Sequence, residues 1–249
     1  MPKYTNLKDL FTAIAYAIRS KTGRSESIIA DDFPTAIAAI ETDKTEDEDG
    51  IITGNLVEYT NDRVTSVAMC RFFNFSRLQK VNLPRVSYVS NNSFTDCLQL
   101  QNIDIPAVVT ISDSAFTGTS ITKLICPNLA RIERYCCVGC SYLKKVDMLG
   151  HDPLSPDVSG YISGASFLRC NTLSTLIIRS TVTVCRLSEV DAFEDTPIAD
   201  GDGYIYVPRA LIEDYKVANN WSAFASQFRA IEDYTVDGTV TGELDSSKI

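Results

Sequence analysis

The sequence is poor in the residues on which catalytic and metal centres most often depend. It has a single histidine, His151, a single tryptophan and three methionines among 249 residues. No G-x-S-x-G, H-E-x-x-H or P-loop pattern is present, so a serine or cysteine nucleophile would have to use His151 as its base. We therefore expect a protein that is not an enzyme, with no catalytic residue, no cofactor and no bound metal.

Basic residues and long apolar segments are also scarce. The 23 lysines and arginines are outnumbered by 32 aspartates and glutamates, which gives a net charge of −9 and a pI of about 4.7. A surface with this charge repels phosphate groups, so we expect no nucleic-acid partner. No apolar run approaches the roughly 18 residues that a membrane span needs, so we expect no membrane insertion.

Cysteine occurs eight times, which is too sparse for a disulfide scaffold in a chain of this length. The chain as given opens with no charged-then-apolar leader, so we expect the thiols to be reduced. The segment Cys136-Cys137-Val138-Gly139-Cys140 contains a C-x-x-C pattern that could begin a zinc site or a redox pair. The sequence has no second C-x-x-C and no histidine pair to complete four zinc ligands, which disfavours that interpretation.

What the sequence does contain is a repeat. The segment SFTDCLQLQNIDIP, residues 93–106, has counterparts along the chain at steps of roughly 20 to 30 residues. One slot of the repeat is mostly phenylalanine, and its occupants are Phe72, Phe94, Phe116, Cys137, Phe167 and Phe193. The slot three residues later holds Phe75, Cys97, Thr119, Cys140, Cys170 and Thr196. Cysteine is therefore one occupant of a slot that threonine also fills.

Most units also contain a short stretch that alternates between apolar and polar residues, which is typical of a half-buried strand. The five stretches are Val81 to Leu83, Ile103 to Ile105, Leu124 to Cys126, Val146 to Met148 and Leu176 to Ile178. Pro84, Pro106 and Pro127 end three of them, because proline cannot donate to a strand ladder. We predict a mainly β fold in which these strands stack in one sheet about 4.8 Å apart, with their apolar residues and the phenylalanine slot directed inward.

The repeat resembles the BspA-type leucine-rich repeat, whose pattern is L-x-x-I-x-I-P-x-x-V-x-x-I-x-x-x-A-F-x-x-C-x-x-L. The segment LQNIDIPAVVTISDSAFTGTS from Leu100 matches this pattern nearly throughout, and the likeness covers roughly residues 64–198. The resemblance implies a leucine-rich-repeat solenoid in which each unit buries its apolar face against its neighbours. It also implies that Cys97, Cys140 and Cys170 are small core hydrophobes.

Residues 1–42 form a predicted helical docking module, followed by an acidic linker and a first capping strand in residues 43–63. The apolar residues expected to contact another subunit are Leu7, Leu10, Phe11, Ile14, Ile18 and Phe33. Short helices are marginal alone, so we expect them to bury these side chains in an assembly. The module resembles a segment that opens many structural proteins of tailed phages and prophages, through the strings LKDLFTAIAYAIRSKTG and IIADDFPTAIAAI. That resemblance implies virion partners, a homo-oligomer within the particle, and a virion location after synthesis in the bacterial cytoplasm.

The C-terminal part of the chain is expected to close the solenoid with a strand-helix cap in residues 199–234. Tyr204 to Val207 would form a last strand and Pro208 would open a helix. A second helix would carry an apolar stripe of Trp221, Phe224, Phe228 and Ile231, which could instead be a ligand platform. The segment Asp200-Gly201-Asp202-Gly203 has calcium-loop spacing, but the glycine and glutamate of such a loop are misplaced, which favours a turn. Residues 235–249 are a polar tail whose VDGTV string favours a small turn or hairpin.

The outward positions of the predicted strands define a candidate partner-binding face, because side chains two apart on a strand point the same way. Its residues are Lys80, Asn82, Asn102, Asp104, Lys123, Lys145 and Asp147, together with His151 in the inserted loop GHDPLSPDVSGYISGA. The alternative is that this row is an ordinary solvated surface. Loops that project from a rigid scaffold often bind partners, although an insertion rich in small residues and proline can also simply be tolerated.

The leading hypothesis is a structural protein of a phage tail, baseplate or fibre, with attachment to a host-surface protein or glycan as a further role. The alternative is a bacterial cell-surface leucine-rich-repeat adhesin, against which stands the lack of a signal peptide and a wall anchor in the chain as given. A third class, an enzyme on a repeat scaffold, has no catalytic constellation to support it.

Overall fold

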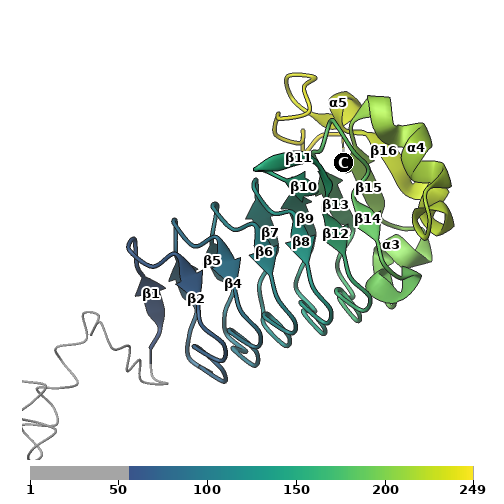
Figure 1. Cartoon of the computed structure of the whole chain (residues 1–249). Coiled ribbons are helices and arrows are strands. Elements are labelled where there is room, and N and C mark those ends of the chain that lie inside the picture. The colour runs from purple at the N-terminus through teal and green to yellow at the C-terminus, as the bar shows by residue number, and fades with distance from the viewer. Residues whose placement is uncertain (1–55, 249) are drawn as a thin grey trace, which may run out of the picture. The chain divides into compact units, whose positions relative to one another are not determined.

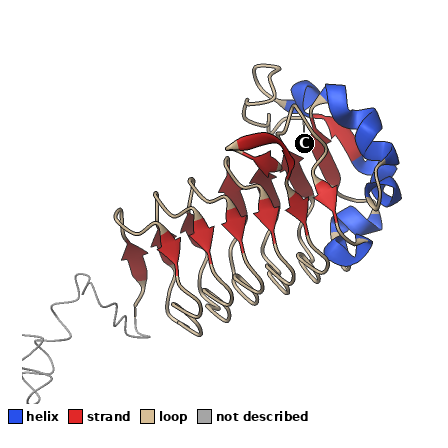
Figure 2. Ribbon diagram, in the orientation of Figure 1, coloured by secondary structure: helices blue, strands red, loops and turns tan. Residues whose placement is uncertain are grey.

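The computed structural model describes residues 56–248, which form a stack of repeat units followed by a C-terminal region (Figure 1). Each unit contributes two short strands and an irregular turn, and the strands pair in parallel with equivalent strands of the neighbouring units. Helices gather at the C-terminal end of the stack (Figure 2). Residues 58–187 are called the repeat stack below.

The first strand of each unit belongs to a row along one side of the stack. Its N-terminal sheet contains β1 (Glu58–Thr60), β3 (Lys80–Asn82) and β5 (Asn102–Asp104). Its C-terminal sheet contains β7 (Lys123–Cys126), β9 (Lys145–Met148), β13 (Thr175–Ile178), β15 (Tyr204–Val207) and β16 (Phe228–Ala230). The inward apolar positions of the five predicted stretches are buried, except Ile103, which is half-buried.

The expectation of a single sheet for this row is wrong, because the row divides between β5 and β7. At the division the Thr122 amide still donates to the Gln101 carbonyl at 3.4 Å, so the two units remain neighbours. The unit that carries β7 lacks one residue between the cysteine slot and the following leucine slot, as the shorter step from Thr119 to Ile121 shows. Because one residue is missing just before β7, this strand does not align with β5, and the two strands do not pair.

Each unit also contains a second strand, which the alternation pattern did not predict. These strands form a six-stranded parallel sheet in the order β14 (Arg186–Leu187), β12 (Tyr161–Ile162), β8 (Arg131–Ile132), β6 (Thr110–Ile111), β4 (Tyr88–Val89) and β2 (Ser66–Val67). The second residue of every strand is an apolar side chain directed into the core. A strand of two residues is too short to reveal itself by alternation.

The phenylalanine slot lies in the turn segments, where it fills the interior of the stack. The Phe94 amide donates to the Ala115 carbonyl of the next unit at 2.8 Å, so the turns as well as the strands are joined by backbone hydrogen bonds. Phe72, Phe94 and Phe116 stack with ring centroids 4.9 and 5.2 Å apart and nearly parallel planes. Their full burial confirms that the slot is directed inward.

The cysteine slot is also interior, and its side chains donate to the carbonyl of the phenylalanine slot in the preceding unit. Cys97 Sγ donates to the Phe72 carbonyl at 2.9 Å. Thr196 donates instead from its hydroxyl to the Phe193 carbonyl of its own unit at 2.6 Å, so both residue types satisfy their donor with a backbone carbonyl inside the core. Burial raises the pKa of the Cys97 thiol to about 12, so the reactive thiolate is disfavoured.

All eight cysteines are free, and seven of them are buried. Cys136 and Cys137 lie side by side, with their sulfur atoms 3.6 Å apart. Within residues 56–248, no group of three or more histidine, cysteine, aspartate or glutamate residues is arranged to hold a metal ion.

The insertion before Phe167 is an antiparallel hairpin rather than an irregular loop, and it contains β10 (His151–Asp152) and β11 (Ser155–Ser159). Two glycines join this hairpin to the stack. Gly150 has a φ of +83°, and a Cβ on it would lie 2.3 Å from a methyl carbon of Ile178. A Cβ on Gly160 would lie 2.2 Å from the Ala130 carbonyl oxygen, so the hairpin leaves and re-enters the stack where no side chain fits.

The C-terminal region adds strands as well as helices to the end of the stack. After η2 (Val190–Phe193), its helices are α3 (Pro197–Asp200), η3 (Arg209–Leu211), α4 (Ile212–Val217), η4 (Trp221–Gln227) and α5 (Ile231–Tyr234). The predicted last strand is present as β15, and Asp200 to Gly203 form the end of a helix and a turn.

The predicted second C-terminal helix is wrong in part. Trp221 and Phe224 lie in η4, whereas Phe228 belongs to β16, which pairs with β15 through Ile205 and Phe228. The four stripe residues are nevertheless buried, and Trp221 packs against Phe193 with ring centroids 6.0 Å apart. They close the end of the aromatic core, so they are not an exposed ligand platform.

The predictions for residues 1–42 and for the acidic linker up to residue 55 lie outside the described residues. Among the helices of residues 56–248, none is long and apolar enough to cross a membrane.

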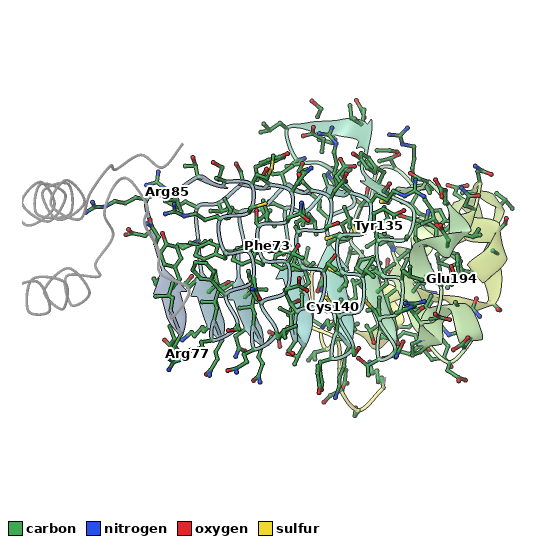
Figure 3. The ribbon with its side chains drawn as sticks, turned by 90° about the horizontal axis from the view of Figure 1, so that it is seen from below. Phe73, Arg77, Arg85, Tyr135, Cys140 and Glu194 are labelled. Atoms are coloured by element: carbon green, nitrogen blue, oxygen red, sulfur yellow. The ribbon has the colours of Figure 1, made fainter. Side chains whose placement is uncertain are left out.

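Replacing Phe116 by alanine should lower the free energy of unfolding by about 3 to 5 kcal/mol, because the ring is fully buried between neighbouring units. The matched control is Phe73→Ala. Phe73, labelled in Figure 3, follows the slot residue of the first unit and is 47% exposed, so its loss should change stability by about 0.5 kcal/mol or less. Urea unfolding measures both, and a Phe116→Ala cost below about 1 kcal/mol would contradict the stacked core.

The pair Cys97→Thr and Cys97→Val tests the hydrogen bond of the cysteine slot. Threonine keeps a donor for the Phe72 carbonyl and should cost less than about 1 kcal/mol, whereas valine has nearly the same shape but no donor. The valine variant should therefore be less stable than the threonine variant by about 1 to 3 kcal/mol. Equal stabilities in urea unfolding would show that packing alone governs this slot.

Candidate functional site

The outward side chains of the first strand row are the candidate partner-binding face. In the N-terminal sheet they align in two columns, with Lys80 between Glu58 and Asn102, and Asn82 between Thr60 and Asp104. Because the strands are parallel and in register, equivalent side chains stand one strand spacing apart, at about 4.8 Å. The structure therefore brings together the four predicted site residues of β3 and β5.

These side chains remain accessible. Lys80, Asn102 and Asp104 are exposed, and Asn82 is half-buried. The side-chain oxygen of Asn82 is itself buried, yet it accepts no hydrogen bond from the described residues. Since buried polar atoms are usually paired, this oxygen is an acceptor available to a donor from a partner or from water.

Strand β7 adds a cation and an apolar side chain to the same face. Lys123 and Ile125 point outward, and Ile125 is 43% exposed. In the three preceding units the equivalent position holds threonine, asparagine and aspartate, so an apolar residue here departs from the alternation of those units. We call the outward residues of β1, β3, β5 and β7 the exposed half-face: Glu58, Thr60, Lys80, Asn82, Asn102, Asp104, Lys123 and Ile125.

The other half of the same row is covered by the chain itself. Residues 235–244 form a hairpin closed by an antiparallel bridge between Thr235 and Leu244, and it is called the tail hairpin below. Val240 and Leu244 of this hairpin pack against Ile177 of β13 and Tyr206 of β15, which are buried although they point outward from the strands. The polar-tail prediction therefore missed its structural role.

An ion pair fastens the tail hairpin to the sheet. The Arg179 guanidinium donates to both carboxylate oxygens of Asp147, at 2.7 and 2.8 Å, and also to the carbonyls of Val240 and Gly242. The two charged side chains are 15% and 8% exposed. The two parallel hydrogen bonds of this pair are charge-assisted and therefore strong. Removing either partner would leave a buried charge unpaired, which is costly.

Two predicted site residues of β9 are therefore largely inaccessible to a binding partner. Asp147 is buried in the ion pair, and its inclusion in an open binding face is wrong, because the Arg179 guanidinium that binds it is in turn held by the tail hairpin. Lys145 is half-buried, and this burial lowers the pKa of its ammonium group. The environment of the outward side chains thus changes along the stack: they face solvent in the N-terminal units and form internal contacts in the C-terminal ones.

His151 lies in a sheet of its own and not on the strand face. It belongs to the β10–β11 hairpin, is half-buried, and its Nδ1 atom makes no hydrogen bond with the described residues. Burial lowers the pKa of its imidazole, which favours the neutral form. The neighbouring Asp152 pairs with Arg131 of β8 at 3.4 Å, so the hairpin is tied toward the six-stranded sheet.

Sequence reasoning missed Ile125, although a signal was present. The stretches Leu124-Ile125-Cys126 and Leu176-Ile177-Ile178 replace the expected polar residue by isoleucine. The structure shows why the second is apolar, since the tail hairpin covers Ile177. No described residue covers Ile125 in the same way. The six apolar residues assigned to assembly, Leu7 to Phe33, lie outside the described residues.

Comparison with known proteins gives a family for the repeat. The family model of the BspA type leucine rich repeat region matches residues 65–197 in six copies. No curated protein matches the chain in sequence.

The solved structures that resemble the chain include three bacterial proteins. The pneumococcal vaccine antigen PcpA has a TM-score of 0.52 and 18% identity, and the match covers 71% of this chain and 40% of the antigen. A leucine rich cell surface protein from Faecalibacterium prausnitzii has a TM-score of 0.30 and 15% identity, over 60% of this chain and 59% of the other. A leucine-rich repeat protein from Bacteroides ovatus has a TM-score of 0.27 and 16% identity, over 71% of this chain and 66% of the other.

The likeness to the pneumococcal antigen is one of fold, and the chain spans well under half of that protein's length. The matched residues 65–197 are the residues whose paired strands, stacked phenylalanines and shared cysteine slot are described above. The chain belongs to the BspA-type leucine-rich repeat family.

Proposed function

We propose that the chain is a non-enzymatic binding protein whose solenoid recognises a protein on a bacterial cell surface through the exposed half-face. The observation that carries this proposal is the contrast between two outward isoleucines of one column. Ile177 is fully buried under the tail hairpin, whereas Ile125 is 43% exposed on a neighbouring part of the same sheet.

Ile125 has the surroundings of an interface anchor. Lys123 lies on the same strand, and in register beside Ile125 stands Asp147, whose charge is neutralised by Arg179. Protein interfaces commonly combine a central apolar side chain with a rim of polar groups, and a few such anchors supply most of the binding energy.

The remainder of the half-face supplies that rim. It presents opposite charges on Glu58 and Lys80, the carboxylate of Asp104 and the unpaired side-chain oxygen of Asn82. These groups are held by paired strands, so their spacing is fixed before a partner arrives. Such preorganisation reduces the entropy lost on binding.

The proposed location is the virion of a tailed phage, in its tail, baseplate or fibre. The support for it is the resemblance of residues 1–42 to the opening segment of phage structural proteins, which implies docking to other virion proteins through that module. A cell-surface adhesin is the second candidate, and it is favoured by the bacterial origin of the pneumococcal antigen that shares the fold. Both locations use the exposed half-face in the same way.

Replacing Ile125 by aspartate should weaken binding of the purified protein to cells of the bacterial host by at least about tenfold, because a charge would have to be desolvated at the interface. The control is Val190→Asp, which places the same charge at a similarly exposed position, 49%, outside the strand row. Flow cytometry with labelled protein measures both. Prior protease treatment of the cells should abolish binding, and wild-type binding by Ile125→Asp would remove the half-face from the proposal.

Fractionation distinguishes the two locations. In the virion case an antibody to the chain detects it in purified phage particles, and a chain without residues 1–42 is missing from them although it still folds. In the adhesin case the antibody detects the full chain in the cell-wall fraction, whether or not particles are produced. Equal incorporation of the full and shortened chains would contradict the docking role of residues 1–42.

A further inference from the structure

The hairpin of β10 and β11 interrupts the repeat, and the proposed function does not use it. Figure 1 shows this hairpin projecting beyond the strands of the repeat stack. Among the described residues its two strands pair only with each other, so they belong to neither strand row. The hairpin therefore adds nothing to the ladders that hold the stack together.

An ion pair fixes the turn at the tip of the hairpin. One carboxylate oxygen of Asp152 lies 3.4 Å from the Arg131 guanidinium of β8, and the other accepts a hydrogen bond from the Leu154 amide at 2.9 Å. The same side chain thus ties the turn to the six-stranded sheet and sets the conformation of the turn itself. The tip is held in place before any partner binds.

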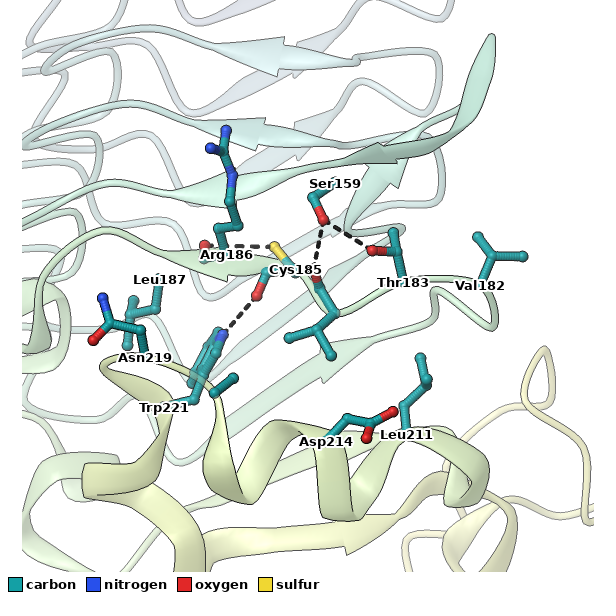
Figure 4. Close-up of a pocket in the computed structure, with 12 residues that line it drawn as sticks. Ser159, Val182, Thr183, Cys185, Arg186, Leu187, Leu211, Asp214, Asn219 and Trp221 are labelled. Atoms are coloured by element: carbon teal, nitrogen blue, oxygen red, sulfur yellow. Dashed lines mark hydrogen bonds between the residues drawn. The ribbon is translucent and has the colours of Figure 1, made fainter.

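Strand β11 bulges between its two paired residues. His151 pairs with Ser159 and Asp152 pairs with Ser155, so the three residues of β11 between them face no residue of β10. The Ser159 hydroxyl is also hydrogen-bonded to the Thr183 hydroxyl in the next unit, at 2.9 Å (Figure 4). A bulge that is fixed at both ends bends its strand and redirects the side chains between them.

The exposed side chains of this segment are largely apolar. Leu154 is 92% exposed and Val158 is 46% exposed, and Pro156 between them is exposed as well. We call Leu154, Pro156 and Val158 the hairpin ridge. Exposed apolar side chains that gather in one place mark interaction sites, whereas single ones are ordinary. Because the segment is already fixed, little conformational entropy is lost when a partner buries it.

The shape and charge of the hairpin ridge restrict its partner. The ridge projects from the protein, so it offers no concave surface to a small molecule. Asp157 lies within it, is exposed and forms no ion pair with a described residue, and its charge disfavours nucleic acid and anionic lipid. Three apolar side chains are also too few to hold a protein on a bilayer. A two-fold contact between copies would bring the two Asp157 carboxylates together, which disfavours a second copy.

The remaining partner is a different protein with a complementary surface. We propose that the hairpin ridge inserts into an apolar groove of a second protein, with a lysine or arginine of that protein paired to Asp157. Pro156 has no N–H group to donate, so the contact is made by side chains rather than by an added strand. This contact does not depend on the exposed half-face, so either can fail without the other.

Photocrosslinking in host cells that produce the full chain tests the contact. Leu154→benzoylphenylalanine and Val158→benzoylphenylalanine should each form one discrete adduct with the same second protein, which mass spectrometry identifies together with the attached residue. The control is Val217→benzoylphenylalanine, at a position of α4 that is 80% exposed, and it should form no such adduct. Ile125→Asp should leave the adducts of the hairpin ridge unchanged.

Binding of the identified protein, once purified, measures the contribution of each group. Leu154→Ser and Val158→Ser should each weaken binding at least tenfold, whereas Val217→Ser should leave it unchanged. Asp157→Lys should weaken binding most at low salt, because salt screens the repulsion between the new cation and the partner's cation. Urea unfolding checks that these surface variants keep the stability of the wild-type chain.

Three results would each overturn the proposal. Neither position of the hairpin ridge forms a discrete adduct, or the adduct joins two copies of this chain or a lipid. Alternatively, Leu154→Ser binds the identified protein as tightly as the wild-type chain does.

Discussion

The parallel pairing of each unit with its neighbours is the constraint on which the rest of the structure depends. Strands of two to four residues have almost no stability of their own, so they persist because backbone hydrogen bonds join them on both sides. The same pairing sets the rings of Phe72, Phe94 and Phe116 about one strand spacing apart, which makes an aromatic column through these three units. Stability in such a stack is a sum of contacts between neighbouring units.

This constraint also creates the proposed binding surface, because residues that recur in the sequence are forced into columns on the outside. The outward column is polar over most of its accessible part, and it is apolar where the tail hairpin covers it at Ile177 and Tyr206. The Asp147–Arg179 pair stands at the boundary between the covered and the accessible parts. Ile125, on the accessible side, is the one apolar member of the exposed half-face, and it is the residue through which we propose that the stack contacts a partner.

The sequence predicted the inward positions well because period-two alternation and the repeated phenylalanine slot report burial directly. It did not predict the second strand row, since two-residue strands carry no periodicity, nor the division before β7, which follows from a single missing residue. The stripe of Trp221, Phe224, Phe228 and Ile231 has helical spacing, yet Phe228 gains more by pairing with β15, so tertiary context overrode the local pattern. Val240 and Leu244 were too few in a polar tail to reveal its contact with the sheet.

Deletion of one whole unit tests whether the fold is a stack of interchangeable units. Removing residues 95–116 joins Phe94 to Thr117, which replaces one phenylalanine slot by the next and leaves every later residue in phase. We expect this variant to show a single cooperative urea transition with a slightly smaller dependence on denaturant, whereas removal of residues 95–105 alone should abolish that transition. A half-unit deletion that unfolds as cooperatively as the whole-unit deletion would contradict it.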